Sequence, residues 1–600
     1  MLAESYIAGL PRRWGIKLAG MFASEGYTKH AEKMRVVHAV QSEVQRVPLD
    51  AGEGALHQAA DAAARECYGY CERYKLASLI VDGISLLCLR MGISRPVGAT
   101  EQEIIARAVD KGWWLRKLRK EHIRRFEHTS IMLGFTSMQA DPYVSREAAM
   151  RQRAYNAANQ KLLESTTVTN GQDEFTLAEL AALGVSNKAI RRGELMLRIR
   201  GFEEIADSLK HVGMFWTITC PSKFHSVGGA NAKYNGATPR DAQAYLCKVW
   251  ARIRAALKRK GIQPYGFRIA EPHSDGCPHW HMLLFIAPEH ETAMSDIVKA
   301  HALREDGTEE GAQKNRVKLV RIEAGKGTAA GYIAKYVSKN IDGYGVGDHK
   351  AFEDGRTYIV QTDIFGNAEI TASERVTYWS QVWGIRQFQQ IGGAPVGVWR
   401  EMRRVAEETV RNAHADVRAA WMACQKIESD DPMIARQADY AEFMKALGGP
   451  TVGRRGRVQL ARRNTVIEGR YATYQEEKPC GVYHVTNANA VYESVRYQWS
   501  RVQPAEVVAA PWTGVNNCTR EWLRELEKRS KDNAEILKNQ KICSANVVID
   551  RDGDWNGDGM RLKPDIGPMS DYLKHRKNAE QRAQEDHLRH LQSKFKDRNG

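Results

Sequence analysis

The sequence predicts an α+β fold, in which helices pack around an antiparallel β-sheet, and three observations support this prediction. Residues 52–160 are rich in alanine and repeat apolar residues at every third and fourth position, which is typical of helices. Short runs rich in β-branched and aromatic residues follow between residues 214 and 324, with one clearly helical stretch at 239–260. A helical segment with two tyrosines comes next. We therefore expect a central sheet preceded by a helical region.

The length and charge narrow the class of protein. Six hundred residues exceed one ordinary hydrophobic core, so we expect two to four domains. The composition, 43% hydrophobic and 27% charged, is that of a globular chain. A net charge of +16 favours a polyanionic partner, because basic surface gains free energy by displacing counterions from phosphates. Charge alone does not separate nucleic acid from an anionic membrane.

We expect no membrane span, no signal peptide and no disulfide framework. The most apolar stretch, residues 76–89, is too short to cross a bilayer and contains an aspartate, so it predicts a buried helix. The N-terminus lacks a charged start followed by an apolar run. Ten scattered cysteines suit a reducing cytoplasm. Cys67 and Cys71 have no second Cys/His pair at zinc-finger spacing, so we expect no structural zinc there.

Two helical segments are candidates for DNA contact. Residues 112–126, GWWLRKLRKEHIRRF, set apolar side chains among cations, which predicts either a helix facing phosphates or a solvated face over a small core. Residues 175–192, FTLAELAALGVSNKAIRR, predict a helix, a Gly-Val-Ser turn and a second helix ending in Arg191 and Arg192. This order resembles a helix-turn-helix, although any helical hairpin with a glycine turn has the same pattern.

The chain past about residue 400 turns basic and irregular, and roughly its last eighty residues are dominated by charge. We expect a loosely packed or partly disordered tail there. Within it, residues 550–559, DRDGDWNGDG, contain the first half of a calcium-binding loop. The position that requires a bidentate glutamate is occupied by Lys563, so we predict a turn-rich acidic loop instead of a calcium site.

The clearest group of metal-type ligands lies in residues 267–285, FRIAEPHSDGCPHWHMLLF. Two strand-like runs flank a five-residue turn, SDGCP. If these strands pair across that loop, His273 lies opposite His279 and Glu271 lies opposite His281. Because side chains alternate along a strand, all four then project from one face, and Trp280 and Met282 point into the core.

This face has the chemistry of a divalent-metal site. Imidazole nitrogens suit transition metals, and a carboxylate beside them also suits Mg²⁺ or Mn²⁺, with positions left for water or substrate. His279 and His281 are the ligands that the pattern favours. The third ligand is either Glu271 or His273, because a bulge in the hairpin would change which of them faces the ion.

A second candidate group follows in residues 331–340, GYIAKYVSKN. Alanines favour a helix here, and residues four apart lie on one helical face about 6 Å apart along the axis. Tyr332 and Tyr336 therefore present two phenols side by side. Lys339 follows on much the same face, with Lys335 at its edge. Two tyrosines on one helical face usually serve in packing. This pair therefore indicates a catalytic role only together with the metal-type ligands in the same domain.

Tyrosine, lysine and a divalent cation together suit phosphoryl transfer to a protein side chain. A phenol with a pKa of about 10 is a poor nucleophile at neutral pH. Nearby ammonium groups favour the phenolate, and a divalent cation polarises the phosphate under attack. Attack on a DNA phosphodiester would preserve the bond energy in a phosphotyrosine link and release a 3′-hydroxyl. Two adjacent tyrosines could cut twice and transfer a strand.

These motifs resemble the replication gene A proteins of temperate tailed bacteriophages, within the HUH endonuclease superfamily. The resemblance covers roughly residues 113–400 and rests on three motifs in the expected order. Residues 215–222, FWTITCPS, resemble the first strand motif, and residues 271–281, EPHSDGCPHWH, resemble the metal motif. Residues 332–339, YIAKYVSK, resemble the two-tyrosine motif, which makes Tyr332 and Tyr336 nucleophiles and Lys335 a phosphate-orienting residue.

The resemblance implies a five-stranded antiparallel sheet with the histidines on a central strand and the tyrosine helix nearby. It implies rolling-circle initiation: strand-specific nicking at a phage origin, a 5′-phosphotyrosine intermediate, later rejoining, and a Mg²⁺ or Mn²⁺ requirement. The expected partners are single-stranded or supercoiled origin DNA and the host replicative helicase and polymerase, in the cytoplasm of a bacterial host. No Gly-x₄-Gly-Lys-Ser/Thr loop is present, so we expect a borrowed helicase.

We accordingly divide the chain into four predicted regions. They are residues 1–165, helical and a candidate for DNA contact; 166–212, a helical hairpin with the candidate helix-turn-helix; 213–400, the HUH endonuclease domain; and 401–600, a basic, partly disordered region. Two alternatives remain. A conjugative relaxase also joins two metal-binding histidines to tyrosine attack but carries its tyrosine before them. A non-catalytic origin-binding protein would explain only the charge.

Overall fold

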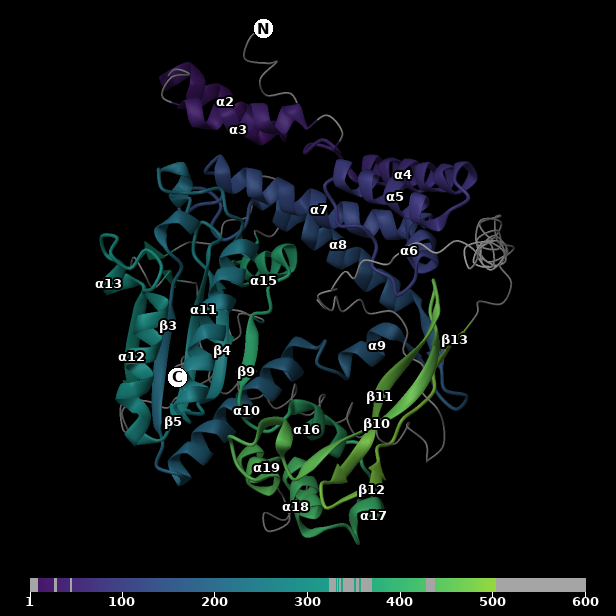
Figure 1. Cartoon of the computed structure of the whole chain (residues 1–600), viewed down its shortest axis with the longest axis vertical. Coiled ribbons are helices and arrows are strands. Elements are labelled where there is room, and N and C mark those ends of the chain that lie inside the picture. The colour runs from purple at the N-terminus through teal and green to yellow at the C-terminus, as the bar shows by residue number, and fades with distance from the viewer. Residues whose placement is uncertain are drawn as a thin grey trace, which may run out of the picture.

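The computed structural model describes residues 9–25, 30–43, 46–322, 331, 333, 336–337, 341, 350–351, 356–357, 370–427 and 437–502. Within these residues the chain is a mixture of helices and antiparallel sheets, so the predicted α+β class is confirmed. The N-terminal helices lie along one end of the molecule, at the top of Figure 1. The central sheet lies below them on one side, and the C-terminal elements lie on the other.

A five-stranded antiparallel sheet forms the centre of the fold, as predicted. Its strands follow the order β6-β3-β5-β4-β9. Their bounds are Val317–Ile322 for β6, Val212–Ile218 for β3, Pro278–Ile286 for β5, Tyr265–Pro272 for β4 and Phe388–Ile391 for β9. Every residue of β4 and β5 is buried, because helices cover both faces of the sheet. The predicted histidines therefore lie on the central strand, β5.

One face of the sheet packs against helices α11 (Pro239–Arg259) and α12 (Glu291–Ala302) (Figure 1). Helix α11 matches the predicted helix at 239–260. It begins at a capping box in which Thr238 and Asp241 satisfy each other's backbone amides. Trp280 and Met282 of β5 belong to this core, as predicted. Helix α15 (Ala372–Trp383) contributes four further aromatic and aliphatic side chains to it.

The opposite face packs against helix α10 (Lys188–Ser208) and helices from the C-terminal region. These C-terminal helices are α16 (Val396–Met402), α17 (Glu407–Val410), α18 (Ala415–Cys424) and α19 (Tyr440–Leu447). Buried Ile333, Val337 and Ile341 join the same core, and their four-residue spacing places them on one side of a helix. In the helix-turn-helix-like segment, the first helix is α9 (Leu177–Ala182) and the second is the start of α10. Because α10 packs against the sheet, this second helix is part of the sheet core.

The N-terminal region is helical, as predicted. It contains α2 (Arg12–Glu25), α3 (Ala31–Ser42), α4 (Glu53–Arg73), α5 (Ala77–Arg90), α6 (Glu101–Ala108), α7 (Lys111–Met132) and α8 (Arg146–Ser165). The apolar stretch at 76–89 becomes α5, which is buried on one face only, since Leu86 and Leu89 are exposed. In the described part of the chain, no helix combines the length and the apolar character needed to span a membrane.

Helix α7 carries the basic segment, and its geometry favours the interpretation of a polar face over a core. Trp113 and Trp114 are buried in the core formed by α4 to α7. Arg119 pairs with Glu53, and the guanidinium of Arg124 donates to two backbone carbonyls in the last turn of α15, at 2.9 and 3.2 Å. These two cations are thus engaged with protein groups.

The C-terminal region is more regular than predicted over residues 401–502. Besides its helices it forms an antiparallel sheet of β10 (Val458–Glu468), β11 (Thr473–His484) and β12 (Asn487–Glu493). The apolar spacing of α19 explains part of this order, because Tyr440, Phe443, Met444 and Leu447 are buried in the sheet core. The predicted tail from residue 503 and the calcium-like loop lie outside the described residues. The division into four regions stays a prediction.

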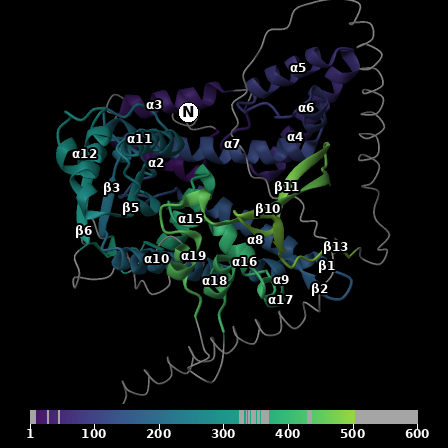
Figure 2. The ribbon, with the colours of Figure 1, turned by 60° about the horizontal axis from the view of Figure 1, so that its bottom comes forward.

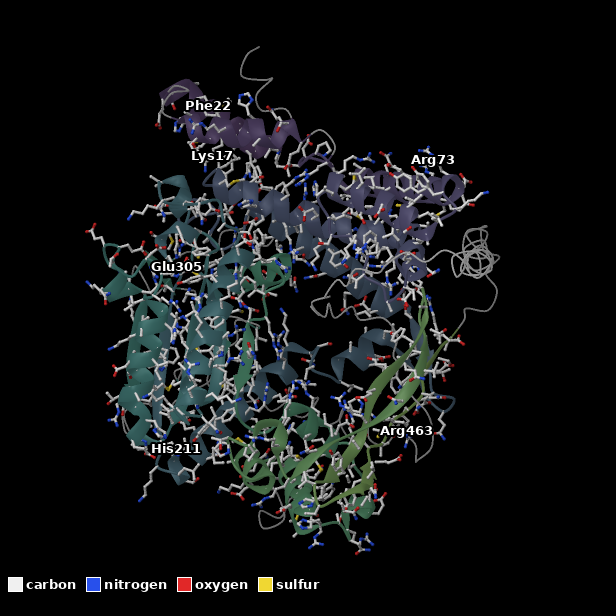
Figure 3. All side chains as sticks on the ribbon, in the orientation of Figure 1. Lys17, Phe22, Arg73, His211, Glu305 and Arg463 are labelled. Atoms are coloured by element: carbon white, nitrogen blue, oxygen red, sulfur yellow. The ribbon has the colours of Figure 1, made fainter. Side chains whose placement is uncertain are left out.

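The β10–β11 hairpin reaches from this core to the N-terminal helices (Figure 2). At its tip, the hydroxyl of Tyr471 donates to Asp110 over 2.5 Å, and Arg470 pairs with the same carboxylate at 2.9 Å. Along the hairpin, Arg463 is exposed and pairs with Glu493 of β12 (Figure 3). Nearby, β13 (Ser500–Arg501) joins β1 (Thr167–Thr169) and β2 (Glu174–Thr176) in a small sheet.

The remaining described elements are short. They are the 3₁₀ turns Ser222–Phe224, Val227–Gly229, Pro288–His290 and Gly453–Arg455, helix α13 (Ala312–Asn315), and the paired strands β7 (Lys350–Ala351) and β8 (Arg356–Thr357).

Candidate active site

Strands β4 and β5 form the predicted hairpin, but the predicted register is wrong by two residues. Glu271 pairs with His279, where we expected it opposite His281, and His273 lies beyond the paired strand residues. A shift of two leaves every side chain on its original face, because the period of a strand is two. Glu271, His279 and His281 therefore still project from one face, as predicted. We call these three residues the metal face.

The tighter register follows from the chemistry of the turn. Asp275 accepts a hydrogen bond from the amide of Cys277 at 3.0 Å, and Gly276 takes a φ of +83°, which suits glycine. The amide of His273 donates to the carbonyl of Cys277 at 2.8 Å, so pairing continues past the ends of the strands. The turn is thus three residues long, whereas the prediction left five residues unpaired.

The three ligand groups of the metal face converge. The Nε2 atoms of His279 and His281 are 2.9 Å apart, and Oε2 of Glu271 lies 3.5 Å from the Nε2 of His281 and 4.0 Å from that of His279. All three residues are at most 7% exposed. One ligand atom from each of the three residues thus lies within 4.8 Å of the other two. This donor set fits a divalent cation that keeps open positions.

Thr217 of β3 supports the metal face from the neighbouring strand. It pairs with His281 across the β3–β5 ladder, and its Oγ1 lies 3.0 Å from Nδ1 of His281. A hydrogen bond at Nδ1 leaves Nε2 directed at Glu271 and His279. The sequence reasoning did not identify Thr217 as a site residue, although it lies in the FWTIT strand motif. Only its cross-strand position reveals the role.

Tyr336 lies against the metal face, as the two motifs predicted. Its ring centroid is 4.4 Å from that of His281, and Phe215 stacks on both rings at 5.7 Å. Tyr336 is half-buried, and the buried Ile333 and Val337 on either side of it anchor this segment to the sheet. The other predicted residues of the segment, Tyr332, Lys335 and Lys339, lie outside the described residues.

His273, the competing third ligand, lies on the far side of His279. Their ring centroids are 4.1 Å apart, but His273 does not share the converging set formed by Glu271, His279 and His281. Burial lowers the pKa of His273 to about 3. Its ring also contacts His225, whose Nδ1 is 3.2 Å from the carboxylate of Asp275. The geometry therefore brings Glu271, and not His273, to the candidate metal position.

A second cluster, formed by His414, Asp416 and His484, also has ligand atoms within 4.8 Å of one another. The rings of His414 and His484 are stacked, with centroids 3.8 Å apart and an interplanar angle of 14°. A metal lies in the plane of each imidazole that binds it, and nearly parallel stacked planes do not meet at one ion. His484 instead hydrogen-bonds to Asp416 at 3.2 Å. This cluster therefore links α18 to β11.

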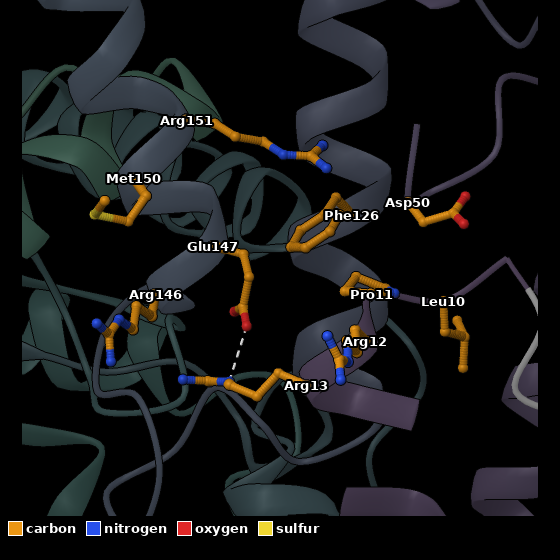
Figure 4. Close-up of a pocket in the computed structure, with 10 residues that line it drawn as sticks. All are labelled: Leu10, Pro11, Arg12, Arg13, Asp50, Phe126, Arg146, Glu147, Met150 and Arg151. Atoms are coloured by element: carbon orange, nitrogen blue, oxygen red, sulfur yellow. Dashed lines mark ion pairs between the residues drawn. The ribbon is translucent and has the colours of Figure 1, made fainter. Parts of the chain in front are cut away.

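A cavity of about 620 Å³ lies away from the predicted residues, between the start of α2 and helices α7 and α8 (Figure 4). Arg13 of α2 forms an ion pair across it with Glu147 of α8, at 2.8 Å. Arg151 lies over the ring of Phe126, 4.5 Å from its centroid. None of the predicted site residues lines this cavity.

Comparisons with known proteins agree with the geometry. Residues 92–344 match the family described as bacteriophage replication gene A protein, a span that includes both the metal face and Tyr336. The chain is 38% identical over 437 residues to the replication gene A protein of Escherichia phage 186, which covers 69% of this chain and 59% of that protein. No solved structure matches the chain significantly.

Two further relatives are similar over comparable lengths. The chain is 36% identical over 435 residues to the probable replication protein P12 of Pseudoalteromonas phage PM2, covering 72% of this chain and 64% of that protein. It is 30% identical over 511 residues to a probable replication endonuclease from a prophage-like region of Escherichia coli. This match covers 81% of this chain and 61% of that protein. The chain thus spans about three fifths of the length of these relatives.

Proposed function

The chain belongs to the bacteriophage replication gene A protein family, and on this premise we propose that it is a replication initiator that nicks one DNA strand through a tyrosine nucleophile. One observation carries the proposal: the ring of Tyr336 lies 4.4 Å from His281, a member of a buried Glu-His-His set. The proposed nucleophile and a metal-type ligand set are thus in contact. A protein that only bound DNA would need neither.

Glu271, His279 and His281 would hold the Mg²⁺ or Mn²⁺ that we propose as the cofactor. A bound divalent cation polarises a phosphoryl oxygen and offsets the charge that develops during attack. Burial of the three ligands excludes bulk water and strengthens their electrostatic effect. Thr217 holds His281 in the orientation that this binding needs, as outer-shell groups do at metal sites.

The chemical step follows from the tyrosine. The phenol oxygen attacks the scissile phosphorus, the bond to the 3′ oxygen breaks, and the phenol proton passes through solvent to that oxygen. The products are a free 3′-hydroxyl and a 5′-phosphotyrosine link. Attack by a later 3′-hydroxyl on that link reverses the step and rejoins the strand. Lys335 would orient the phosphate, and Lys339 would favour the phenolate.

Tyr332 would supply the second nucleophile. With two tyrosines, the protein could hold one 5′ end while it cuts again, as rolling-circle replication requires. We further propose that the substrate is single-stranded or supercoiled origin DNA and that the host helicase and polymerase extend the released 3′-hydroxyl in the bacterial cytoplasm. The order of the motifs, with Tyr336 after His281, favours this initiator over a relaxase-like nickase.

Mass spectrometry of the covalent adduct tests the proposal directly. The protein is incubated with single-stranded origin oligonucleotides and Mn²⁺, digested and analysed for a phosphotyrosine-linked nucleotide. We expect the adduct on Tyr336 or Tyr332 and its disappearance from the Tyr332→Phe/Tyr336→Phe double variant. An adduct on neither tyrosine would contradict the mechanism. A protein that shifts the mobility of supercoiled origin DNA and never yields an open circle would be the binding-only alternative.

A further inference from the structure

Two exposed arginines from distant parts of the chain both contact Phe388 at the edge of the central sheet. Arg191 lies in the first turn of α10, and its guanidinium is over the ring of Phe388, 5.8 Å from the centroid. Arg386 lies two residues before the start of β9, and its Nε donates to the carbonyl of Phe388 at 3.1 Å. Partial burial lowers the pKa of Arg191, and the positive charge of Arg386 lowers it further. Both guanidinium groups therefore lie beside Phe388.

Neither cation is neutralised by a carboxylate within the described part of the chain. Their neighbours differ in this respect, because Arg198 and Arg400 both pair with Glu194, at 3.4 and 2.7 Å. Two like charges held together cost free energy, and an anion bound between them removes that cost. Arginine is suited to this role, because its planar guanidinium can donate two hydrogen bonds to one phosphate. The pair thus has the features of an anion-binding site.

The position of the pair relates it to the metal face. Phe388 pairs with Ile269 across β9 and β4, and Ile269 pairs with His281 across β4 and β5. Directly paired residues of antiparallel strands point to the same face, so Arg191, above Phe388, lies on the side of the sheet that carries the metal face. Neighbouring strands are about 4.8 Å apart, which places β9 roughly 10 Å from β5. Tyr336 lies toward the other neighbour of β5, because it contacts Phe215 of β3.

We propose that Arg191 and Arg386 bind a backbone phosphate of the DNA strand, flanking the phosphate that the tyrosine attacks. This inference rests on the proposed function, since it takes the metal face as the place of cleavage. The strand would lead from Tyr336 and the metal face toward the arginines beside β9. It also gives the helix-turn-helix-like segment a role, because α10 carries Arg191 to the sheet edge. The contact is to the backbone and carries no base preference.

Salt-dependent binding of single-stranded DNA tests the site. The full chain with Tyr336→Phe, in EDTA to prevent cleavage, is titrated with a short fluorescent oligonucleotide of mixed sequence at several salt concentrations. Each phosphate contact to a single strand contributes about 0.7 to the slope of log affinity against log salt. We expect Arg191→Ala and Arg386→Ala each to weaken binding about threefold to tenfold at low salt and to flatten that slope. Arg191→Lys keeps the charge and should keep the slope.

Arg200→Ala is the matched control, because Arg200 lies on the same helix, is exposed and pairs with Glu204. It should leave the slope unchanged. An unchanged slope in both Arg191→Ala and Arg386→Ala, or equal flattening in Arg200→Ala, would overturn the proposal, as would a parent protein that binds no single strand. Because no cleavage is measured, the result of this titration is independent of the adduct experiment. A protein that binds DNA through the arginines but never forms an adduct would contradict only the nicking mechanism.

Discussion

The hydroxyl of Thr217 lies 3.0 Å from Nδ1 of His281, a residue 64 positions later in the sequence on the neighbouring strand. This contact determines which imidazole nitrogen is left to face Glu271 and His279. A histidine that binds a metal through Nε2 needs a partner for Nδ1, and the hydroxyl is that partner here.

Replacing Thr217 with valine should weaken metal binding about tenfold or more, because His281 loses the hydrogen bond that holds its ring orientation. Isothermal titration with Mn²⁺ measures this without any DNA. Thr217→Ser keeps the hydroxyl and should bind within about threefold of the parent. Equal affinities for the valine variant and the parent would show that the bond has no role in metal binding.

Glu271→Gln and His273→Gln should separate the two candidates for the third ligand. Loss of the Glu271 charge should reduce Mn²⁺ affinity about a hundredfold, because the carboxylate lies among the two Nε2 atoms. His273→Gln should change it little, since His273 lies beyond His279 and outside the converging set. The same titration decides between them, and the opposite ranking would make His273 the ligand.

Asp110→Ala should lower the free energy of unfolding by about 1–3 kcal/mol. Its carboxylate caps α7 by accepting from the amides of Gly112 and Trp113, and it also holds Tyr471 at the hairpin tip. Tyr471→Phe leaves the cap in place and removes only the hydrogen bonds of the Tyr471 hydroxyl with Asp110 and Arg116, so it should cost less, about 1 kcal/mol. Urea unfolding measures both changes. Equal losses in the two variants would mean that the cap contributes nothing.

The stability of the helical region around Glu127 should fall as the pH rises. Burial raises the pKa of Glu127 to about 8, although hydrogen bonds from Ser145 and Thr136 oppose this. The folded state therefore keeps a proton that the unfolded state releases above about pH 4.5, so stability is fully present below that pH and declines up to about pH 8.

Thermal unfolding at pH 5 and pH 8 checks this prediction. The slope should be at most about 1.4 kcal/mol per pH unit for one proton. Glu127→Gln has no titrating group and keeps hydrogen-bonding capacity, so its difference between the two pH values should be smaller than that of the parent. An identical difference in both proteins would assign the pH dependence to other groups.

Much of the site could be predicted from short stretches of sequence. The alternation of side chains along a strand placed Glu271, His279 and His281 on one face, and this result survived the error in register because an even shift preserves the face. The spacing of apolar residues likewise located α11 within one or two residues. The register itself depended on the hydrogen bond from the amide of Cys277 to Asp275, which strand periodicity does not encode.

Local periodicity and residue chemistry were enough to predict the fold class, the motif that carries the metal-type ligands and the face on which they lie. Which residues meet became visible only in the folded chain. It placed Tyr336 against His281, gave His281 its partner Thr217, and brought Arg191 and Arg386 to Phe388 from positions almost two hundred residues apart. The physical reason is that strand order and helix packing set such contacts, and both depend on the burial of the whole chain's apolar surface.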